Sequence, residues 1–216
     1  MERTTWTGVG VEPLLARALP LLDRNRRSVL GLAGAPASGK STLTTQLVAE
    51  LQARHPGAVV SVGMDAFHIG HRILAERGQE SIKGAPETFD ALGYVALLER
   101  IRSTSDTLYA PEFHREIEDS IAHEVEISPA VRLVVTEGNY LLLPQHPWAA
   151  VRPLLDAAWF LHLDIAERQR RMVERRLRYG NTLEVATAMT LGSDEANAQL
   201  VDAEQNSPDL WIELTD

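Results

Sequence analysis

The stretch VLGLAGAPASGKSTLTTQL, from Val29 to Leu47, decides the fold. It begins as a short apolar run, breaks into small residues, and continues after Lys40 with leucines at helical spacing. An apolar run that ends in glycine is typical of a buried strand, and leucines four residues apart share one face of a helix. The stretch therefore predicts a strand over 28–33, a loop, and a helix over 42–54.

The loop itself, GAPASGKS, matches the pattern G-x-x-x-x-G-K-[ST] of phosphate-binding loops. Glycine lets the backbone curl so that several N–H groups point inward, and the following helix adds the positive end of its dipole. We expect Lys40 to reach the outer phosphates of a nucleoside triphosphate and Ser41 to bind Mg²⁺. A flexible strand-to-helix turn is the alternative. The predicted nucleotide-binding residues are Gly34, Ala35, Pro36, Ala37, Ser38, Gly39, Lys40, Ser41 and Thr42.

Composition and charge limit the other classes of function. The chain has 216 residues, 44% of them hydrophobic, so it can bury a core, and we expect one domain over residues 1–216. Its net charge of −9 argues against a nucleic-acid partner, and the lack of cysteine excludes disulfides and thiolate metal sites. No apolar run approaches the roughly 20 residues of a membrane span. The polar start lacks the apolar core of a signal peptide, so we expect a cytoplasmic protein with no membrane partner.

The rest of the chain alternates strand and helix patterns. Strands are predicted over 57–65, 131–138 and 157–164, and the final LWIELTD is expected as a strand at the edge of the sheet. Helices are predicted over 12–26, 90–102, 147–155 and 165–179, with two short helices after Asn181, which suggests a capping box with Glu184. This alternation predicts an α/β fold, with a mainly parallel sheet of five strands and helices on both faces.

Two acidic residues lie at the ends of predicted strands, where open α/β sheets place their chemistry. Asp65, in GMDAFH, is expected to face the γ-phosphate and to accept the proton of an attacking hydroxyl or hold a magnesium-bound water. Glu137 closes the strand in LVVTEG, so Ser41, Asp65 and Glu137 form the predicted metal site. The alternatives are a helix cap for Asp65 and an ordinary turn for Glu137. We expect His68 to hydrogen-bond the substrate rather than to bind a metal together with His71.

The segment IAERQRRMVERRLRYG carries arginines at i, i+3, i+7 and i+10, which form one stripe of a helix: Arg168, Arg171, Arg175 and Arg178. Because this segment is locally basic in an acidic protein, it fits a lid, over roughly 165–200, that closes on transferring phosphate. A solvated face with ordinary i, i+4 ion pairs is the alternative, above all for Arg170 and Arg176, which lie off the stripe.

Taken together, GAPASGKST, MDAFH, KGAPETFD, VVTEGNYLLL and RMVERRLRYG resemble the uridine kinase, phosphoribulokinase and pantothenate kinase group. The resemblance is greatest to its bacterial nucleoside/nucleotide kinase-like branch, also labelled fructose-transport-system kinase. It implies a P-loop kinase fold that uses ATP and Mg²⁺ to phosphorylate a hydroxyl of a small metabolite. It also implies a base at Asp65 and lid arginines at Arg171 and Arg175; with Lys40, these are the expected catalytic residues.

On the acceptor side, the resemblance implies contacts from three residues of KGAPETFD: Lys83, Phe89 and Asp90. Asp90 fits equally well as the cap of the helix that follows. Relatives often have Phe-Asp-Arg where this chain has PEFHREIEDSIA; Arg115 still fits a residue that grips the acceptor, whereas His114 in place of the acid leaves recognition of sugar hydroxyls open. Asn197, in DEANAQL, is expected to reach the active site or, alternatively, to be a cap or surface residue.

The acceptor is the least determined part of this interpretation. A sugar or sugar-like polyol is expected first, a nucleoside second and a pantothenate-like molecule third. A nucleoside site needs an aromatic or arginine face for the base, and the sequence offers several candidates: Phe67, Phe89, Tyr109, Phe113 and Tyr140. The rival from another class is a regulatory protein that binds ATP without an acceptor, which would be expected to lack the strand-end carboxylates. Many relatives dimerise, so a homodimer also stays open.

Overall fold

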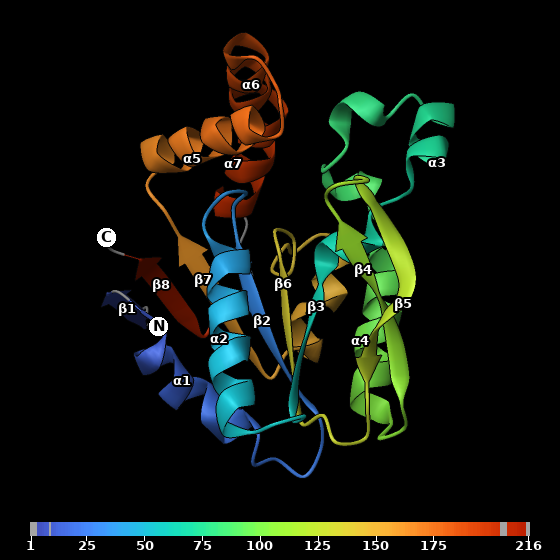
Figure 1. Cartoon of the computed structure of the whole chain (residues 1–216), viewed down its shortest axis with the longest axis vertical. Helices are drawn as coiled ribbons and strands as arrows, with labels where there is room; N and C mark the ends of the chain where they lie inside the picture. The colour runs from blue at the N-terminus through green and yellow to red at the C-terminus, as the bar shows by residue number, and fades with distance from the viewer. Residues whose placement is uncertain (1–3, 9, 204–206, 215–216) are drawn as a thin grey trace.

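A six-stranded sheet forms the centre of the computed structural model, which describes residues 4–8, 10–203 and 207–214 (Figure 1). Its strands are β1 (Thr5–Gly8), β2 (Ser28–Gly34), β3 (Val59–Gly63), β6 (Leu133–Gly138), β7 (Ala157–His162) and β8 (Leu210–Leu214). The order across the sheet is β1-β8-β7-β2-β6-β3, and every neighbouring pair is parallel. The predicted α/β fold with a parallel sheet is therefore confirmed.

The sheet has six strands instead of the predicted five, because the polar first residues supply β1. β1 pairs with β8, so LWIELTD does not lie at the edge of the sheet as predicted: β8 runs between β1 and β7. In β1, Thr5 and Thr7 are exposed whereas Trp6 and Gly8 are half-buried. Four residues with one large apolar side chain are too few to give a readable strand period.

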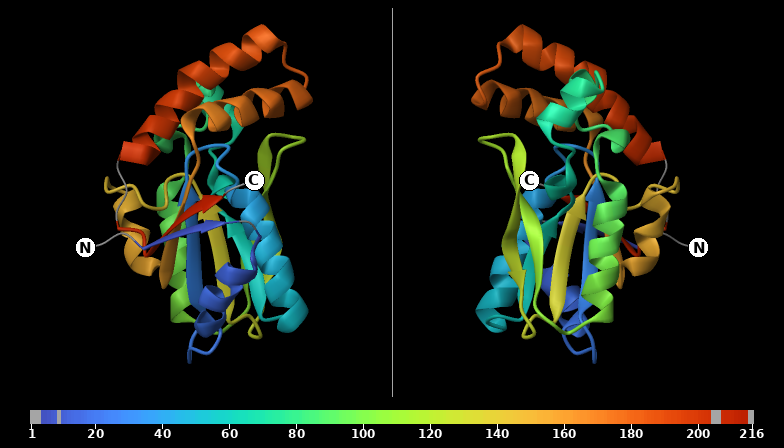
Figure 2. Two further views of the ribbon diagram at one scale, coloured as in Figure 1. Left: turned by 90° about the vertical axis from the view of Figure 1, so that its left-hand side faces the viewer. Right: turned by 90° about the vertical axis from the view of Figure 1, so that its right-hand side faces the viewer.

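Helices cover both faces of the sheet, as the two views of Figure 2 show. α1 (Glu12–Ala18) and α2 (Lys40–Arg54) pack on one face, where Leu14 and Leu47 are fully buried. α4 (Ala91–Ser103) packs on the other face with its own set of buried side chains. Residues of β2 enter both cores, as expected for a strand that is covered on both sides. None of the described helices has the length and apolar character needed to cross a membrane.

Proline shortens or divides two of the predicted helices. The helix predicted over 12–26 ends at Ala18 and gives way to a 3₁₀ turn, Leu19–Leu21, that contains Pro20. The helix predicted over 147–155 is instead two 3₁₀ turns, Trp148–Ala150 and Arg152–Leu154. Proline has no N–H group to donate within a helix, which favours such short turns.

The capping box predicted at Asn181 is wrong by one residue. The N-cap of α6 (Leu183–Met189) is Thr182, whose hydroxyl accepts a hydrogen bond from the Val185 amide at 3.3 Å. The Asn181 side chain instead donates to the Arg176 carbonyl at the end of the preceding helix.

An antiparallel hairpin of β4 (Leu108–His114) and β5 (Asp119–Ile127) lies beside β3, and the sequence analysis did not predict it (Figure 1). Its inner side buries Leu108, Ala110 and Ile127 in the same core as α4. Most of β5 is exposed or half-buried, so its sequence shows little apolar alternation. The turn of this hairpin carries Arg115 to the carboxyl end of the sheet.

A layer of helices lies above the carboxyl ends of the strands (Figure 1). It consists of α5 (Ile165–Arg178), α6, a π-helical turn (Thr190–Asp194) and α7 (Glu195–Ala203). Arg168 of α5 is 2% exposed and donates to Glu195 of α7 at 2.8 Å. This member of the predicted arginine stripe therefore joins two helices. α3 (His71–Glu76) also lies above this end of the sheet, beside the layer and separated from it in the view of Figure 1.

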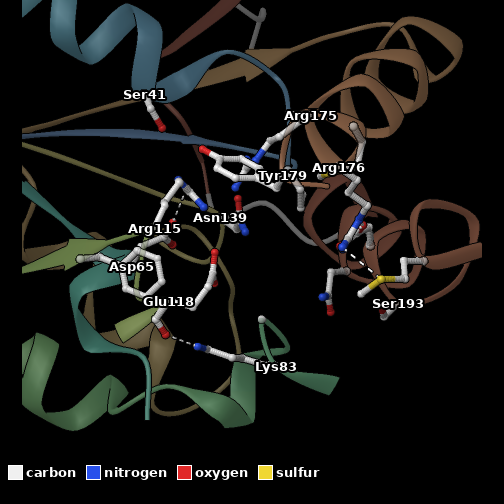
Figure 3. Close-up of a pocket in the computed structure, with 18 of the residues that line it drawn as sticks. Ser41, Asp65, Lys83, Arg115, Glu118, Asn139, Arg175, Arg176, Tyr179 and Ser193 are labelled. Atoms are coloured by element: carbon white, nitrogen blue, oxygen red, sulfur yellow. Dashed lines mark hydrogen bonds and ion pairs between the residues drawn. The ribbon is translucent and has the colours of Figure 1, made fainter. Parts of the chain in front are cut away.

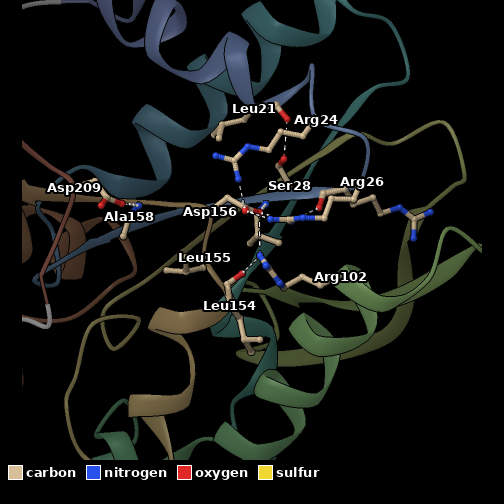
Figure 4. Close-up of polar contacts among 12 residues, drawn as sticks. Leu21, Arg24, Arg26, Ser28, Arg102, Leu154, Leu155, Asp156, Ala158 and Asp209 are labelled. Carbon is tan, nitrogen blue, oxygen red and sulfur yellow. Dashed lines mark hydrogen bonds and ion pairs between the residues drawn. The ribbon is translucent and has the colours of Figure 1, made fainter.

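At the opposite end of the sheet, a buried carboxylate joins several segments (Figure 4). Asp156 precedes β7, and its side chain is 3% exposed. It accepts hydrogen bonds from Arg26 at 3.0 Å, from Arg102 at 3.1 Å and from the Val29 amide at 2.9 Å. Burial alone would raise the pKa of Asp156, but the hydrogen bonds from Arg26 and Val29 outweigh it and lower that pKa. The cluster ties β2, β7 and α4 together at their ends.

Candidate active site

A cavity of about 750 Å³ opens at the carboxyl ends of β2, β3 and β6 (Figure 3). Its walls come from the loop after β2, the residues that follow β3 and β6, the tip of the β4–β5 hairpin, and the α5–α7 layer. Parallel strands end at the same edge of a sheet, so residues distant in sequence gather there.

The loop between β2 and α2 curls tightly against β7. Gly34 has φ 154°, and a Cβ added there would lie 2.6 Å from the Leu161 carbonyl oxygen, so this position requires glycine. Ala37 and Gly39 are left-handed, with φ of 63° and 99°. Six of the predicted nucleotide-binding residues line the cavity: Pro36, Ala37, Gly39, Lys40, Ser41 and Thr42. The other three, Gly34, Ala35 and Ser38, are buried and are absent from the described cavity wall.

The Lys40 side chain is buried and folds back onto its own loop. Its ammonium donates to the Ala35 carbonyl at 2.9 Å. Burial lowers the pKa of Lys40, whereas the negative charges of Glu137 and Asp65 act in the opposite direction. The ammonium is therefore held ready at the cavity wall by a single backbone acceptor.

Both predicted strand-end acids face the cavity. Glu137 is the penultimate residue of β6, and its carboxylate accepts from the Ser41 hydroxyl at 2.9 Å. Asp65 lies in the 3₁₀ turn after β3 and accepts from Arg115 at 3.1 Å. Burial raises the pKa of Glu137, and the charge of Asp65 adds to this shift. One hydroxyl and two carboxylates make an all-oxygen donor set, which suits a hard divalent cation such as Mg²⁺.

Four of the residues expected on the acceptor side line the cavity: His68, Lys83, Phe89 and Arg115. The His68 ring lies between Phe89 and Phe113, with centroid distances of 4.0 and 4.9 Å. Its Nδ1 lies 2.7 Å from the Asp65 carbonyl, which can only accept, so Nδ1 carries the proton. Burial lowers the pKa of His68, which keeps the imidazole neutral and leaves Nε2 as an acceptor.

Asp90 is absent from the described cavity wall, so the geometry gives no support to the predicted substrate contact there. Its carboxylate accepts from the Gly93 amide at 2.9 Å and caps α4. The capping role that was given as the alternative is therefore present, and a contact with the acceptor stays a prediction. His71 likewise does not pair with His68: its Nε2 lies 2.9 Å from the Lys83 ammonium.

His114, which replaces an acid of the relatives, is absent from the described cavity wall. Its ring nitrogens contact Glu124 and Glu116 of the hairpin. Its neighbours in sequence, Phe113 and Arg115, do line the cavity. Strand residues alternate in direction, so the His114 substitution falls on the side of the hairpin that turns away from the cavity.

Among the arginines of α5, Arg171 and Arg175 line the cavity as expected, and so does Asn197 of α7. Burial lowers the pKa of Arg175, and the nearby charge of Arg115 adds to the effect. Arg170 is exposed and pairs with Glu167 and Glu174, which is the surface role given as the alternative.

The remaining off-stripe arginine, Arg176, also lines the cavity, although it is tied to Asp194 at 2.6 Å. Figure 3 shows it on the wall formed by the α5–α7 layer, close to Ser193. The arginines of α5 therefore divide into cavity residues and structural or surface residues, and the helical stripe alone does not separate them.

Several wall residues were missed from the sequence: Glu118, Asn139, Tyr179 and Asn181. Asn139 follows Glu137 by two residues, so the strand-end rule that selected Glu137 could have found it. Tyr179 ends the arginine-rich helix, and Figure 3 shows its ring extending into the cavity near Arg175. Glu118 lies at the tip of the hairpin, so no signal was available until that hairpin was known.

Comparisons with known proteins identify the group to which the chain is related. No family model matches the chain. A Schizosaccharomyces pombe protein named "Putative uridine kinase" is 32% identical over 210 residues, which cover 94% of this chain and 89% of that protein. A pantothenate kinase of Enterococcus faecalis is 30% identical over 161 residues, which cover 73% of this chain and 51% of that protein.

A solved structure agrees with these relatives. The crystal structure described as a "putative fructose transport system kinase" from Silicibacter sp. TM1040 has a TM-score of 0.87 and 35% identity, and the match covers 94% of this chain and 99% of that one. The chain therefore belongs to the P-loop kinases of the uridine kinase, phosphoribulokinase and pantothenate kinase group. It is an enzyme of the class that phosphorylates a hydroxyl of a small molecule.

Proposed function

We propose that this kinase uses ATP and Mg²⁺ to phosphorylate a hydroxyl of a sugar or sugar-like polyol. The observation that carries the proposal is the meeting of Lys40, Ser41, Asp65 and Glu137 at one wall of a cavity of about 750 Å³. We further propose that residues 1–216 act as one domain in which the helices of roughly 165–200 form a lid. The relatives support the kinase class, and the choice of acceptor rests on the cavity.

The triphosphate would lie against the loop after β2, with the Lys40 ammonium exchanging the Ala35 carbonyl for phosphate oxygens. Ser41, Asp65 and Glu137 would hold Mg²⁺, which neutralises negative charge on the phosphoryl oxygens when it is bound. Arg171 and Arg175 stand on the opposite wall and would add positive charge as the phosphoryl group transfers.

Asp65 would orient and deprotonate the attacking hydroxyl. Its carboxylate is half-buried and is aligned by the Arg115 guanidinium at 3.1 Å. Phosphoryl transfer depends mainly on alignment and charge neutralisation, so a carboxylate of ordinary basicity suffices. His68 would offer Nε2 to a hydroxyl of the acceptor, since its Nδ1 is engaged by the Asp65 carbonyl.

The charge of the cavity favours a neutral acceptor. Seven basic and five acidic side chains line its described wall, a net charge of +2, and His68 is neutral. Magnesium-bound ATP carries about two net negative charges and would balance this excess. A carboxylate acceptor of the pantothenate type would then meet no remaining positive charge.

The aromatic rings near the acceptor side favour a polyol over a nucleoside. The Lys83 ammonium and the Arg115 guanidinium each lie 5.7 Å from the centroid of Phe113. Phe89 packs against His68, Tyr140 and Trp148. These contacts occupy the rings that a base would stack on, so a nucleoside would depend on Tyr179 instead.

The test is ADP release measured across a panel of neutral sugars and polyols, nucleosides and pantothenate, with Asp65→Asn protein as the control for acceptor-independent hydrolysis. Turnover on a neutral polyol supports the proposal. A clear preference for nucleosides or pantothenate would overturn the acceptor assignment. Stabilisation by a non-hydrolysable ATP analogue without turnover on any acceptor would favour the regulatory alternative.

A further inference from the structure

The β4–β5 hairpin and its turn carry a histidine and three glutamates that are absent from the described wall of the main cavity. One nitrogen of His114 and one carboxylate oxygen each of Glu112 and Glu124 lie within 4.8 Å of one another. The His114 Nε2 contacts the Glu124 carboxylate directly. A third carboxylate, that of Glu116, stands 3.6 Å from Nδ1 on the other side of the ring.

Among the residues that the structure describes, His114 is the one basic partner of the glutamates in this cluster. Within the described part of the chain, no lysine or arginine forms an ion pair with Glu112, Glu116 or Glu124. Other surface carboxylates of the protein do have one, such as Glu12 with Arg54 and Glu167 with Arg170. Three carboxylates around one imidazole leave an excess of negative charge that a cation would neutralise.

We propose that Glu112, His114 and Glu124 form a binding site for a divalent transition-metal ion, distinct from the magnesium site of the kinase. An imidazole nitrogen with carboxylate oxygens is a ligand set of Zn²⁺, and the exposed side of the cluster lets water complete the coordination. Glu116 would accept from Nδ1 and so present Nε2 to the metal, the arrangement that orients histidine ligands in metal sites.

A metal ion at this position would fasten β4 to β5. Glu112 and His114 belong to β4, and Glu124 belongs to β5. Phe113 and Arg115, the neighbours of His114 in sequence, line the cavity. Metal binding at His114 would therefore restrict the same short segment that places these two residues in the cavity wall. The expected consequence is a more stable hairpin turn and, through it, a firmer Arg115–Asp65 contact.

The test is a calorimetric titration of untagged, full-length protein with ZnCl₂ in the absence of nucleotide. Wild type should bind Zn²⁺, and His114→Ala should weaken that binding at least about tenfold. The matched control is His123→Ala, since His123 lies on the same hairpin next to Glu124 but contacts Tyr109 instead. This control should bind Zn²⁺ as wild type does.

A second readout is the visible absorption of bound Co²⁺, which should appear in wild type and in His123→Ala and be lost in His114→Ala. Glu124→Gln provides an independent variant should His114→Ala fold poorly, and it should also weaken Zn²⁺ binding. No zinc uptake by wild type would overturn the proposal. Equal zinc binding by His114→Ala and wild type would place the metal elsewhere, for example at the cavity carboxylates, and would overturn it as well.

Discussion

The two ends of the central sheet hold their charged side chains in different ways. At the amino ends, Asp156 is buried among Arg24, Arg26 and Arg102 and receives a backbone amide as well (Figure 4). At the carboxyl ends, Asp65 has one arginine partner and Glu137 has one hydroxyl partner, and both face a cavity (Figure 3). The first arrangement satisfies its charges and the second leaves them available.

The pKa shifts record the same difference. Hydrogen bonds lower the pKa of Asp156 in spite of its burial, so its ionised form stabilises the fold. At the carboxyl end, burial raises the pKa of Glu137 and lowers that of Lys40, so holding both charged works against the fold. Charges kept at a cost to stability are what a site for phosphate and metal requires.

Among variants that compare the two ends of the sheet, Asp65→Asn is expected to have the largest effect, and that effect is on catalysis. We expect kcat to fall about a thousandfold, or about 4 kcal/mol, because the hydroxyl loses its proton acceptor. The free energy of unfolding should change by no more than about 1 kcal/mol, since the Asp65–Arg115 pair is partly exposed. Steady-state kinetics, nucleotide affinity and chemical denaturation together measure this. Near-normal turnover with intact ATP binding would contradict the assigned role.

Asp156→Asn should show the opposite pattern. Removing the charge leaves Arg26 and Arg102 without their shared partner, and we expect a loss of about 3 kcal/mol in unfolding free energy. For a chain of this size the melting temperature should fall by about 10 °C. The kcat measured well below that temperature should be unchanged. Glu12→Gln, which removes only an exposed ion pair with Arg54, serves as control and should cost less than about 1 kcal/mol.

A comparison of wild type with Asp156→Asn at different pH values tests the cluster around Asp156 at the amino ends of the strands. The pKa of Asp156 in the folded state lies below its ordinary value of 3.8, so its contribution is present above that value and is lost as the pH falls through the lower, folded-state pKa. The stability difference between wild type and Asp156→Asn should therefore be full at neutral pH and should shrink below about pH 4. A difference that stays constant into acid would show that Asp156 acts through packing alone.

Arg175→Gln tests whether α5 contributes to catalysis together with the residues at the carboxyl ends of the strands. Within the part of the chain that the structure describes, the Arg175 side chain forms no hydrogen bond or ion pair, and it lines the cavity. We expect kcat to fall about 30-fold, or about 2 kcal/mol, with little change in stability. Arg170→Gln, on the outer side of the same helix, should leave kcat unchanged. Equal losses in both variants would indicate a general effect on α5.

Asp90→Ala should give the smallest effect, and it should change the stability of the fold rather than catalysis. It removes the cap of α4 and should cost about 1 kcal/mol of unfolding free energy. The KM for the acceptor should not change, because Asp90 lies outside the cavity wall. A tenfold or greater rise in KM would return Asp90 to the substrate-binding group.

Local signals in the sequence predicted the parts of the site that lie on the central strands. The loop after β2 is defined by consecutive residues, and Asp65 and Glu137 follow apolar runs whose ends meet at one edge of a parallel sheet. These three features needed only chain order and strand recognition. They are also the features that the structure brings together around the cavity.

The rest depends on contacts between distant segments. Arg168 shares its stripe with Arg171 and Arg175, yet it is buried because Glu195 of another helix receives it. β1 has only four residues, and most of β5 is exposed or half-buried, so the sequences of these strands carry little periodicity. For the same reason the side of β4 occupied by His114 could not be assigned before the hairpin was known.

The folded-back ammonium of Lys40 links nucleotide binding to proton uptake. Burial lowers the pKa of Lys40 in the nucleotide-free protein, and the phosphates of a bound nucleotide would raise it again. In alkaline solution, binding would therefore draw a proton from the buffer, and affinity would decline as the pH rises past the lowered pKa. The observed binding enthalpy would then depend on the ionisation enthalpy of the buffer. Calorimetry in buffers of different ionisation enthalpy would therefore measure the proton that the protein takes up when nucleotide binds.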